Sequence, residues 1–274
     1  MSLIVASILV LMFLNLVLGS VSIPLKSVWN IICGLGDEPV TWQNIVWKSR
    51  LPQALTALVA GAGLAISGLQ MQTVFRNPLA GPSVLGISSG ASMGVAFVVL
   101  LSGSLGGVAL SKLGFMGAIA LSIAAVIGSL SVMALIVYVS QKVKGNVTLL
   151  IIGVMIGYVA NAVIGVLKFF SVEEDIRAYV IWGLGSFSRV SGNQMMLFVA
   201  IMAILIPLSF LLIKTLNLML LGDGYARNLG LNIKRARLLV ITSAGVLTAI
   251  VTAYCGPVIF LGLAVPHLCR AIFQ

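Results

Sequence analysis

The sequence predicts an all-α polytopic membrane protein with about eight transmembrane helices, and two observations carry this prediction. First, the 274 residues are 60% hydrophobic and only 8% charged, whereas about a quarter of the residues of a soluble domain are charged. Second, the charges lie between long charge-free windows, such as 113–141 and 238–269. A spanning helix needs about 20 apolar residues, so each window is long enough for one span. The strict alternation of a membrane β-barrel is missing.

The charge-free windows set the approximate positions of the spans. We expect them at about 3–20, 52–72, 84–101, 115–139, 148–168, 194–213, 238–255 and 257–272. The first lacks the positively charged start of a signal peptide, so we expect it to be retained. The sequence therefore predicts a single transmembrane domain over residues 1–274.

Basic residues in the short loops predict the orientation. The tightest group, Lys234, Arg235 and Arg237, follows the sixth predicted span and favours a cytoplasmic location for that loop. The N-terminus is then cytoplasmic, and the acidic run Glu173–Asp175 lies outside, where we expect a solvated loop. The net charge of +10 does not indicate a nucleic-acid partner, because no contiguous basic patch with interleaved aromatic residues is present.

The sequence lacks the motifs that several classes of protein require for their function. The phosphate-binding pattern Gly-x-x-x-x-Gly-Lys-Ser/Thr is missing, so the chain is not itself an ATPase, and no enzymatic motif replaces it. No predicted span carries a carboxylate, which disfavours the alternative of an ion-driven secondary transporter. Three scattered cysteines and one histidine, His267, predict neither a metal site nor a cofactor.

Small residues recur at helical spacing along the fifth predicted span, as Gly153, Gly157, Asn161 and Gly165. Residues four apart share a helix face. In a membrane, such a stripe either lets two helix backbones approach closely or faces an open pathway. The sequence leaves both interpretations open.

Two spans are interrupted in a similar way. Gly81-Pro82 is followed by Leu85-Gly86, and Gly256-Pro257 is followed by Leu261-Gly262. Breaks at matching places in two halves of a transporter indicate an inverted repeat.

A series of motifs runs in order along nearly the whole chain. In chain order they are Arg50-Leu51-Pro52-Gln53, Gly61-Ala62-Gly63-Leu64-Ala65-Ile66-Ser67-Gly68, Gln72, Arg76-Asn77-Pro78-Leu79-Ala80-Gly81-Pro82, Leu85-Gly86, Gly90-Ala91, Trp182-Gly183-Leu184-Gly185-Ser186-Phe187, Leu221-Gly222-Asp223, Ala226, Leu229-Gly230, Gly256-Pro257-Val258-Ile259-Phe260-Leu261-Gly262-Leu263, Pro266-His267 and Arg270. With these motifs the sequence closely resembles the iron-chelate and cobalamin uptake permeases, often called the FecCD family.

The resemblance implies a ten-helix permease that pairs as a homodimer. Two cytoplasmic ATP-binding subunits would drive it, and a periplasmic binding protein would deliver a ferric siderophore, haem or vitamin B12. The pathway would run along the dimer axis, lined by the fifth helix and its residues Gly153, Gly157, Asn161 and Gly165. The sequence ends at Gln274, after the eighth span, and Gln53 stands where the family often has arginine. The resemblance implies that the family's last two helices are absent from the sequence, and we therefore expect the chain to insert into a membrane without supporting uptake.

Arg50 and residues 216–237 are the two candidate docking elements. Arg50 is either an interfacial anchor or, as the resemblance implies, an ion-pair partner of the binding protein. Residues 216–237 form either an amphipathic helix on the membrane or, as the resemblance favours, a cytoplasmic segment that couples to the ATPase. The coupling residues are then Gly222, Asp223, Ala226, Arg227, Leu229 and Gly230. We expect Asp223 to cap a short helix there and Gly230 to close it.

His267 follows Pro266 near the end of the last predicted span. A proline inside a helix frees a backbone carbonyl, and we expect the histidine ring to hydrogen-bond to a carbonyl nearby. The residues thus predict a structural histidine rather than a ligand.

Overall fold

The protein's structure is a computed structural model that describes residues 2–35, 37–104, 114–143, 145–190 and 192–273. In these ranges the chain forms helices and connecting turns, with no strand. Contacts within the chain group it into two compact units. Unit 1 comprises Met1–Ala60 with Ser186–Ile201, and unit 2 comprises Gly61–Gly185 with Met202–Gln274. The expectation of one domain over 1–274 stays a prediction beside this division.

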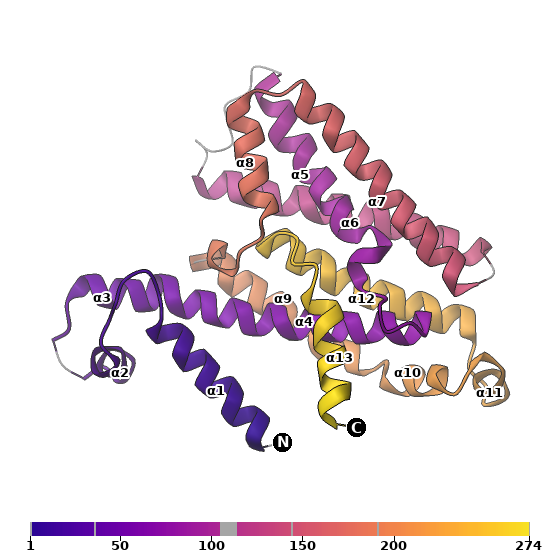
Figure 1. Ribbon diagram of the computed structural model, residues 1–274, viewed down its shortest axis with the longest axis horizontal. Coiled ribbons are helices and arrows are strands. Elements are labelled where there is room, and N and C mark those ends of the chain that lie inside the picture. The colour runs from indigo at the N-terminus through magenta and orange to yellow at the C-terminus, as the bar shows by residue number, and fades with distance from the viewer. Residues whose placement is uncertain (1, 36, 105–113, 144, 191, 274) are drawn as a thin grey trace. The chain divides into compact units, whose positions relative to one another are not determined.

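The helices follow one another along the chain (Figure 1). Their bounds are α1 Ser2–Val17, α2 Leu25–Cys33, α3 Val40–Ile45, η1 Val46–Arg50, α4 Leu51–Phe75, η2 Pro82–Leu85, α5 Ile87–Ser104, α6 Gly114–Lys142, α7 Asn146–Phe169, α8 Glu173–Gly183, η4 Phe187–Arg189, α9 Gly192–Phe210, α10 Ile213–Leu220, α11 Asp223–Asn228, α12 Ile233–Cys255 and α13 Leu261–Phe273.

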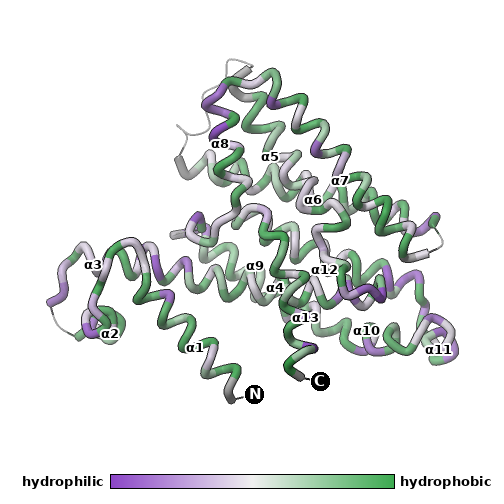
Figure 2. The backbone as a smooth tube through the Cα atoms, in the orientation of Figure 1, coloured by the Kyte–Doolittle hydropathy of each residue, from purple (hydrophilic) through white to green (hydrophobic). Residues whose placement is uncertain are grey.

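Eight of these helices correspond to the eight predicted spans. Five helical stretches are long and apolar enough to cross a membrane, namely Val40–Phe75, Met116–Lys142, Val147–Phe169, Gly192–Phe210 and Ile233–Cys255. Three shorter apolar helices are Ile4–Val17, Ile87–Leu101 and Leu261–Ile272. Figure 2 shows hydrophobic residues along these helices and hydrophilic residues gathered near α11 and the start of α12. The predicted fold class, an all-α polytopic membrane protein, is confirmed.

Two spans begin later than predicted, and in each case a glycine with a positive φ precedes the helix. Pro82–Leu85 forms a short 3₁₀ helix, and Gly86 then takes a φ of 75° before α5 begins. Gly256 has a φ of 79°, and α13 begins only at Leu261. Left-handed backbone of this kind is readily adopted by glycine and interrupts a helix.

The expectation of a solvated loop at the acidic run was wrong. Glu173, Glu174 and Asp175 form the first turn of α8, where negative charge is stabilised by the helix dipole. Asp175 is buried, and this burial, together with the neighbouring Glu174, raises the pKa of its carboxyl group. The run therefore starts a helix, and one of its members belongs to the interior.

In unit 2, α5 packs most extensively against α6, and Figure 1 shows the two helices side by side. Gly90 and Gly94 on α5 meet Gly128 on α6. A Cβ atom on Gly90 would lie 2.6 Å from the carbonyl oxygen of Gly128, and one on Gly94 would overlap the carbonyl group of Ala124. Gly90 and Gly94 therefore allow the backbones of α5 and α6 to approach closely, which is a known role of small residues in membrane helices.

The helix α4 makes a second close crossing, with α13. A Cβ atom on Gly68 would overlap the carbonyl group of Gly262. One residue earlier, the Ser67 hydroxyl donates to the carbonyl oxygen of Ala244 at 2.8 Å and lies 2.7 Å from the Thr248 hydroxyl of α12. Neighbouring positions of α4 thus contact two different helices.

In unit 1, Arg50 holds the end of α1. Its side chain is 4% exposed, and its Nη1 donates to the carbonyl oxygens of Leu16 and Val17 at 2.8 and 2.7 Å, while Nη2 donates to that of Val21. The last carbonyls of a helix have no partner within the helix, so the guanidinium caps α1. The proposed contact of Arg50 with a binding protein stays a prediction, and it would require this buried group to leave its carbonyl partners.

The crossing of α4 and α13 predicts a sharp difference between two glycines of α4. We expect Gly68→Ala to lower the free energy of unfolding by about 1–3 kcal/mol, because the added methyl group meets backbone that cannot move aside easily. Gly61 has nothing within 4 Å of its Cβ position, so Gly61→Ala should leave stability unchanged or raise it slightly. Thermal unfolding in detergent compares the two variants, and equal effects would contradict the close crossing.

The burial of Arg50 predicts a similar contrast. Arg50→Gln should lower the free energy of unfolding of unit 1 by about 1.5–3 kcal/mol, because the α1 carbonyls lose a charged donor. The exposed neighbour Lys48 serves as the control, and Lys48→Gln should have little effect. Hydrogen exchange of residues 14–21 measures the loosening of the α1 end. Normal protection in Arg50→Gln would show that the guanidinium does not hold this end.

Candidate functional site

The predicted coupling segment, 216–237, folds as the end of α10, the short helix α11 and the beginning of α12. Gly230 closes α11 as predicted, with a φ of 86°. The N–H groups of Gly230 and Leu231 donate to the carbonyl oxygens of Arg227 and Ala226, each at 2.9 Å. This pairing is the Schellman motif, in which a left-handed residue ends the helix.

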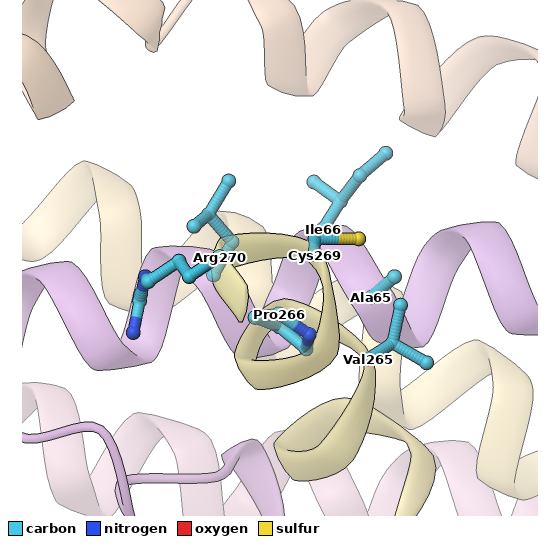
Figure 3. Close-up of a pocket in the computed structure, with 7 residues that line it drawn as sticks. Ala65, Ile66, Val265, Pro266, Cys269 and Arg270 are labelled. Carbon is cyan, nitrogen blue, oxygen red and sulfur yellow. The ribbon is translucent and has the colours of Figure 1, made fainter. Parts of the chain in front are cut away.

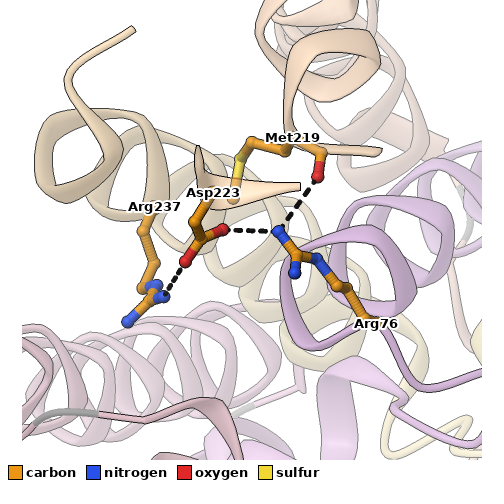
Figure 4. A network of polar contacts seen from close by, with 4 residues as sticks. All are labelled: Arg76, Met219, Asp223 and Arg237. Atoms are coloured by element: carbon orange, nitrogen blue, oxygen red, sulfur yellow. Dashed lines mark hydrogen bonds and ion pairs between the residues drawn. The ribbon is translucent and has the colours of Figure 1, made fainter. Parts of the chain in front are cut away.

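The prediction that Asp223 caps α11 was wrong. Gly222 occupies the cap position, and no side chain caps the helix start. The Asp223 carboxylate instead forms an ion pair with Arg76, at 2.5 Å, and lies 3.9 Å from Nη2 of Arg237 (Figure 4). Arg76 also donates to the carbonyl oxygen of Met219 at the end of α10, at 3.3 Å. One carboxylate therefore connects the loop after α4, the coupling segment and α12.

Arg76 starts a tight turn that the motif residues build. Arg76 is the one non-glycine residue with a positive φ in the described chain, at 48°, a conformation that costs an L-residue roughly 1–2 kcal/mol. The Asn77 side chain accepts from the N–H of Leu79 at 2.9 Å, and its carbonyl accepts from the N–H of Ala80 at 3.0 Å. With Pro78 between these contacts, the turn leads directly into η2 (Pro82–Leu85).

The outer face of the coupling segment is apolar. Leu221, Tyr225 and Leu229 are spaced four residues apart and are all exposed, Tyr225 to 73%. Ala226, one of the predicted coupling residues, is fully buried and is not part of this exposed surface. The sequence analysis did not single out Tyr225 as a coupling residue, although it stands four positions before Leu229, and Leu221 lies just before Gly222, where α10 has ended and α11 has not begun.

The small-residue stripe of α7, the fifth apolar helix, divides into two halves. Gly153 and Gly157 are buried. A Cβ atom on Gly153 would lie 2.8 Å from Cα of Leu85, and one on Gly86 would lie 3.0 Å from the carbonyl oxygen of Gly153. Asn161 and Gly165 are exposed, with nothing within 4 Å of the Cβ position of Gly165. The first half of the stripe thus packs against Leu85 of η2 and against Gly86 and Ser89, which follow it, and the second half is open.

The two Gly-Pro motifs lie far apart in the sequence, at Gly81-Pro82 and Gly256-Pro257, but the segments that carry them meet in space. A Cβ atom on Gly262 would lie 3.1 Å from the ring of Pro82, and one on Gly81 would lie 3.8 Å from Cβ of Leu263. Direct contact of the two breaks is consistent with the predicted inverted repeat, which stays a prediction.

Gly256 and Pro257 also close onto the end of α8. A Cβ atom on Gly256 would lie 2.8 Å from the carbonyl oxygen of Trp182 and 2.9 Å from Cα of Gly185, and one on Gly185 would lie 3.3 Å from the carbonyl oxygen of Pro257. Two motifs that the sequence presents separately are therefore one packing contact in the fold.

The expectation of a satisfied structural histidine at position 267 was wrong. Pro266 is buried in α13, but His267 is exposed, and its ring makes no hydrogen bond to the part of the chain that the structure describes. Pro266 instead lines a cleft of about 400 Å³ between α4 and α13, together with Val265, Cys269 and Arg270 on α13 (Figure 3). Among the described residues no cluster of histidine, cysteine or carboxylate side chains suits a metal ion.

Comparison with known proteins finds similar transport permeases. The haemin transport system permease protein of Yersinia pestis is 33% identical over 255 residues, which cover 92% of this chain and 72% of that protein. The vitamin B12 import system permease protein of Photorhabdus laumondii is 36% identical over 231 residues, covering 84% of this chain and 66% of that one. The chain thus spans about two thirds or somewhat more of the length of these relatives.

A solved structure agrees in fold. A metal-chelate type ABC transporter in an inward-facing conformation matches with a TM-score of 0.79 and 28% identity, over 97% of this chain and 79% of that one. The sequence model of the FecCD transport family matches residues 7–274. The motifs, the helices and these relatives agree, and the chain belongs to the FecCD transport family.

Proposed function

We propose that this chain is the membrane-spanning permease subunit of an ATP-binding-cassette importer for a metal chelate. Its relatives are permeases of haemin and vitamin B12 import systems, and its structural neighbour is a metal-chelate transporter. The cargo of this class is a ferric siderophore, haem or cobalamin. The chain supplies the pathway, and separate ATP-binding subunits supply the energy, so the permease itself carries out no chemical step.

The observation that carries the proposal is the exposed apolar face of Leu221, Tyr225 and Leu229. It lies in a segment that joins two membrane helices rather than within a span. An exposed apolar patch outside the lipid marks a site for a partner. A cytoplasmic ATP-binding subunit is the partner that this class of transporter requires, and α11 is short enough to seat in a groove on its surface.

The contacts of Arg76 give a route from this face to the pathway. Asp223 at the start of α11 is paired with Arg76, whose turn leads into η2. In turn, η2 packs against Gly153 of α7, and Gly86, directly after η2, packs against Gly153 and Gly157. A displacement of α11 by the ATPase would therefore move η2 against the helix that carries Asn161 and Gly165. Exposed ion pairs add little stability, so a mechanical role accounts better for the strained backbone at Arg76.

We place the pathway along the exposed half of α7, between two copies of the chain. Asn161 offers a hydrogen-bonding side chain there, and Gly165 leaves space. Weak polar contacts of this kind suit a chelate that must be released. A periplasmic binding protein would deliver the chelate to the other end, and the protein would reside in a bacterial inner membrane with its N-terminus in the cytoplasm.

The orientation predicts which cysteines react from outside the cell. The native Cys33 is exposed on α2, in a loop that we place outside. In a chain that retains only Cys33, a membrane-impermeant thiol reagent should label intact cells. In a cysteine-free chain carrying Asn232→Cys, labelling should require lysis of the cells. The reverse pattern would overturn the orientation and the coupling role with it.

The coupling face predicts that a single truncation weakens the ATPase partner. Tyr225→Ala should reduce copurification with the ATP-binding subunit by about tenfold or more, as expected of an exposed aromatic anchor. Asn228→Ala, on the same helix but outside the apolar face, is the matched control and should copurify normally. Gly230 is a poor site for this test, because any side chain at its φ of 86° strains the turn.

The same two variants also test the proposed function as a whole. Copurification of the unmodified chain with an ATP-binding subunit is the expected result. Uptake that follows an ion gradient without ATP would refute the proposal. Equal copurification of Tyr225→Ala and Asn228→Ala would leave the permease assignment standing but remove α11 as its coupling element.

A further inference from the structure

A basic cleft of about 550 Å³ lies beside the coupling segment, at the end of α6 and the beginning of α12. Its charged lining residues are Lys142, Arg227, Lys234, Arg237 and Asp223. Four cations therefore face one carboxylate. That carboxylate is already engaged by Arg76 from outside the cleft, at 2.5 Å. The local charge is strongly positive and selects an anionic ligand.

The cleft also holds an unused donor. The Nε atom of Arg237 is buried and has no hydrogen-bond partner in the ranges that the structure describes. A buried donor without a partner costs roughly 1–3 kcal/mol, so an acceptor in the cleft would be favoured. The first N–H groups of α12, at Ile233 and Lys234, add donors because a helix start leaves such groups without partners inside the helix.

The position of the cleft identifies the kind of anion. Two membrane-spanning stretches meet there, since Met116–Lys142 ends and Ile233–Cys255 begins at its lining. Nζ of Lys142 donates to the Tyr138 hydroxyl at 2.5 Å and lies 4.5 Å from the centre of its ring. Tyrosine and lysine side by side at a span end are typical of the membrane–water interface, which is where phospholipid phosphates lie.

We propose that this cleft binds the phosphate headgroup of an anionic phospholipid from the cytoplasmic leaflet. Basic pockets at the ends of membrane helices bind such headgroups, and a volume of about 550 Å³ is within the range of small-ligand sites. Arg227 belongs to α11, and Lys234 and Arg237 belong to α12. A bound headgroup therefore ties the coupling segment to the ends of two spans and holds α11 at the membrane surface.

The test uses the full chain purified in detergent, with phosphatidylglycerol as the probe and phosphatidylcholine as the neutral comparison. Native mass spectrometry measures retained lipid, and thermal unfolding measures stabilisation. We expect Lys234→Gln to weaken phosphatidylglycerol binding about fivefold, the effect of about 1 kcal/mol for each cation near an anionic surface. Arg227→Gln should act similarly. Arg235→Gln is the matched control, because Arg235 is adjacent on α12 and exposed but does not line the cleft.

Three results would overturn the proposal. Equal losses in Lys234→Gln and Arg235→Gln would show a general attraction of charge rather than a site. Inorganic phosphate that binds as tightly as phosphatidylglycerol and displaces it would identify a free phosphate as the ligand. Normal lipid binding by Lys234→Gln with loss of the ATP-binding subunit would assign the cleft to a protein interface. Unchanged unfolding of all variants in phosphatidylcholine verifies that they fold, so that the lipid result stands independently of uptake.

Discussion

Close approach of helix backbones at glycine is the constraint on which the rest of unit 2 depends. In lipid, apolar side chains gain little by leaving one apolar neighbour for another, so packing distance decides which helices associate. The crossings of α5 with α6 at Gly90 and Gly94, and of α4 with α13 at Gly68, leave no room for even a methyl group. These contacts fix where η2 and α13 lie, and the Gly-Pro breaks are positioned by them.

The ion pairs at the coupling segment have a different role from these backbone contacts. Arg76, Asp223 and Arg237 connect three elements where the chain leaves the membrane helices. The pair is too exposed to contribute much stability, yet Arg76 keeps a backbone conformation that disfavours any side chain. Glycine at position 76 would relieve the strain but would lose the guanidinium. Arg76 therefore keeps the contact between α11 and the turn before η2, although its backbone conformation is strained.

The sequence predicted the apolar helices well because hydrophobic length is a property of the local chain. The Gly230 helix end was predictable for the same reason, since a left-handed C-terminus favours glycine. The wrong expectations concern residues whose environment comes from distant segments. Asp223 is paired with Arg76, 147 positions away. The burial of Arg50 among carbonyls of α1 is likewise set by another segment, and its docking role stays a prediction. His267 was expected to follow its neighbour Pro266, but the packing of α13 leaves its ring exposed.

The division of the α7 stripe shows why spacing alone left two interpretations open. Gly153, Gly157, Asn161 and Gly165 share one helix face, but a face can be covered along part of its length only. The end of η2 covers the stripe at Gly153, and Gly86 and Ser89, which follow η2, cover it at Gly157. In the proposed orientation the covered half is cytoplasmic and the open half faces the outer side of the membrane. A displacement of α11 would then be transmitted through Arg76 and η2 to one end of α7. Because the other end of α7 lines the proposed pathway, a small movement at the membrane surface would change the width of the pathway.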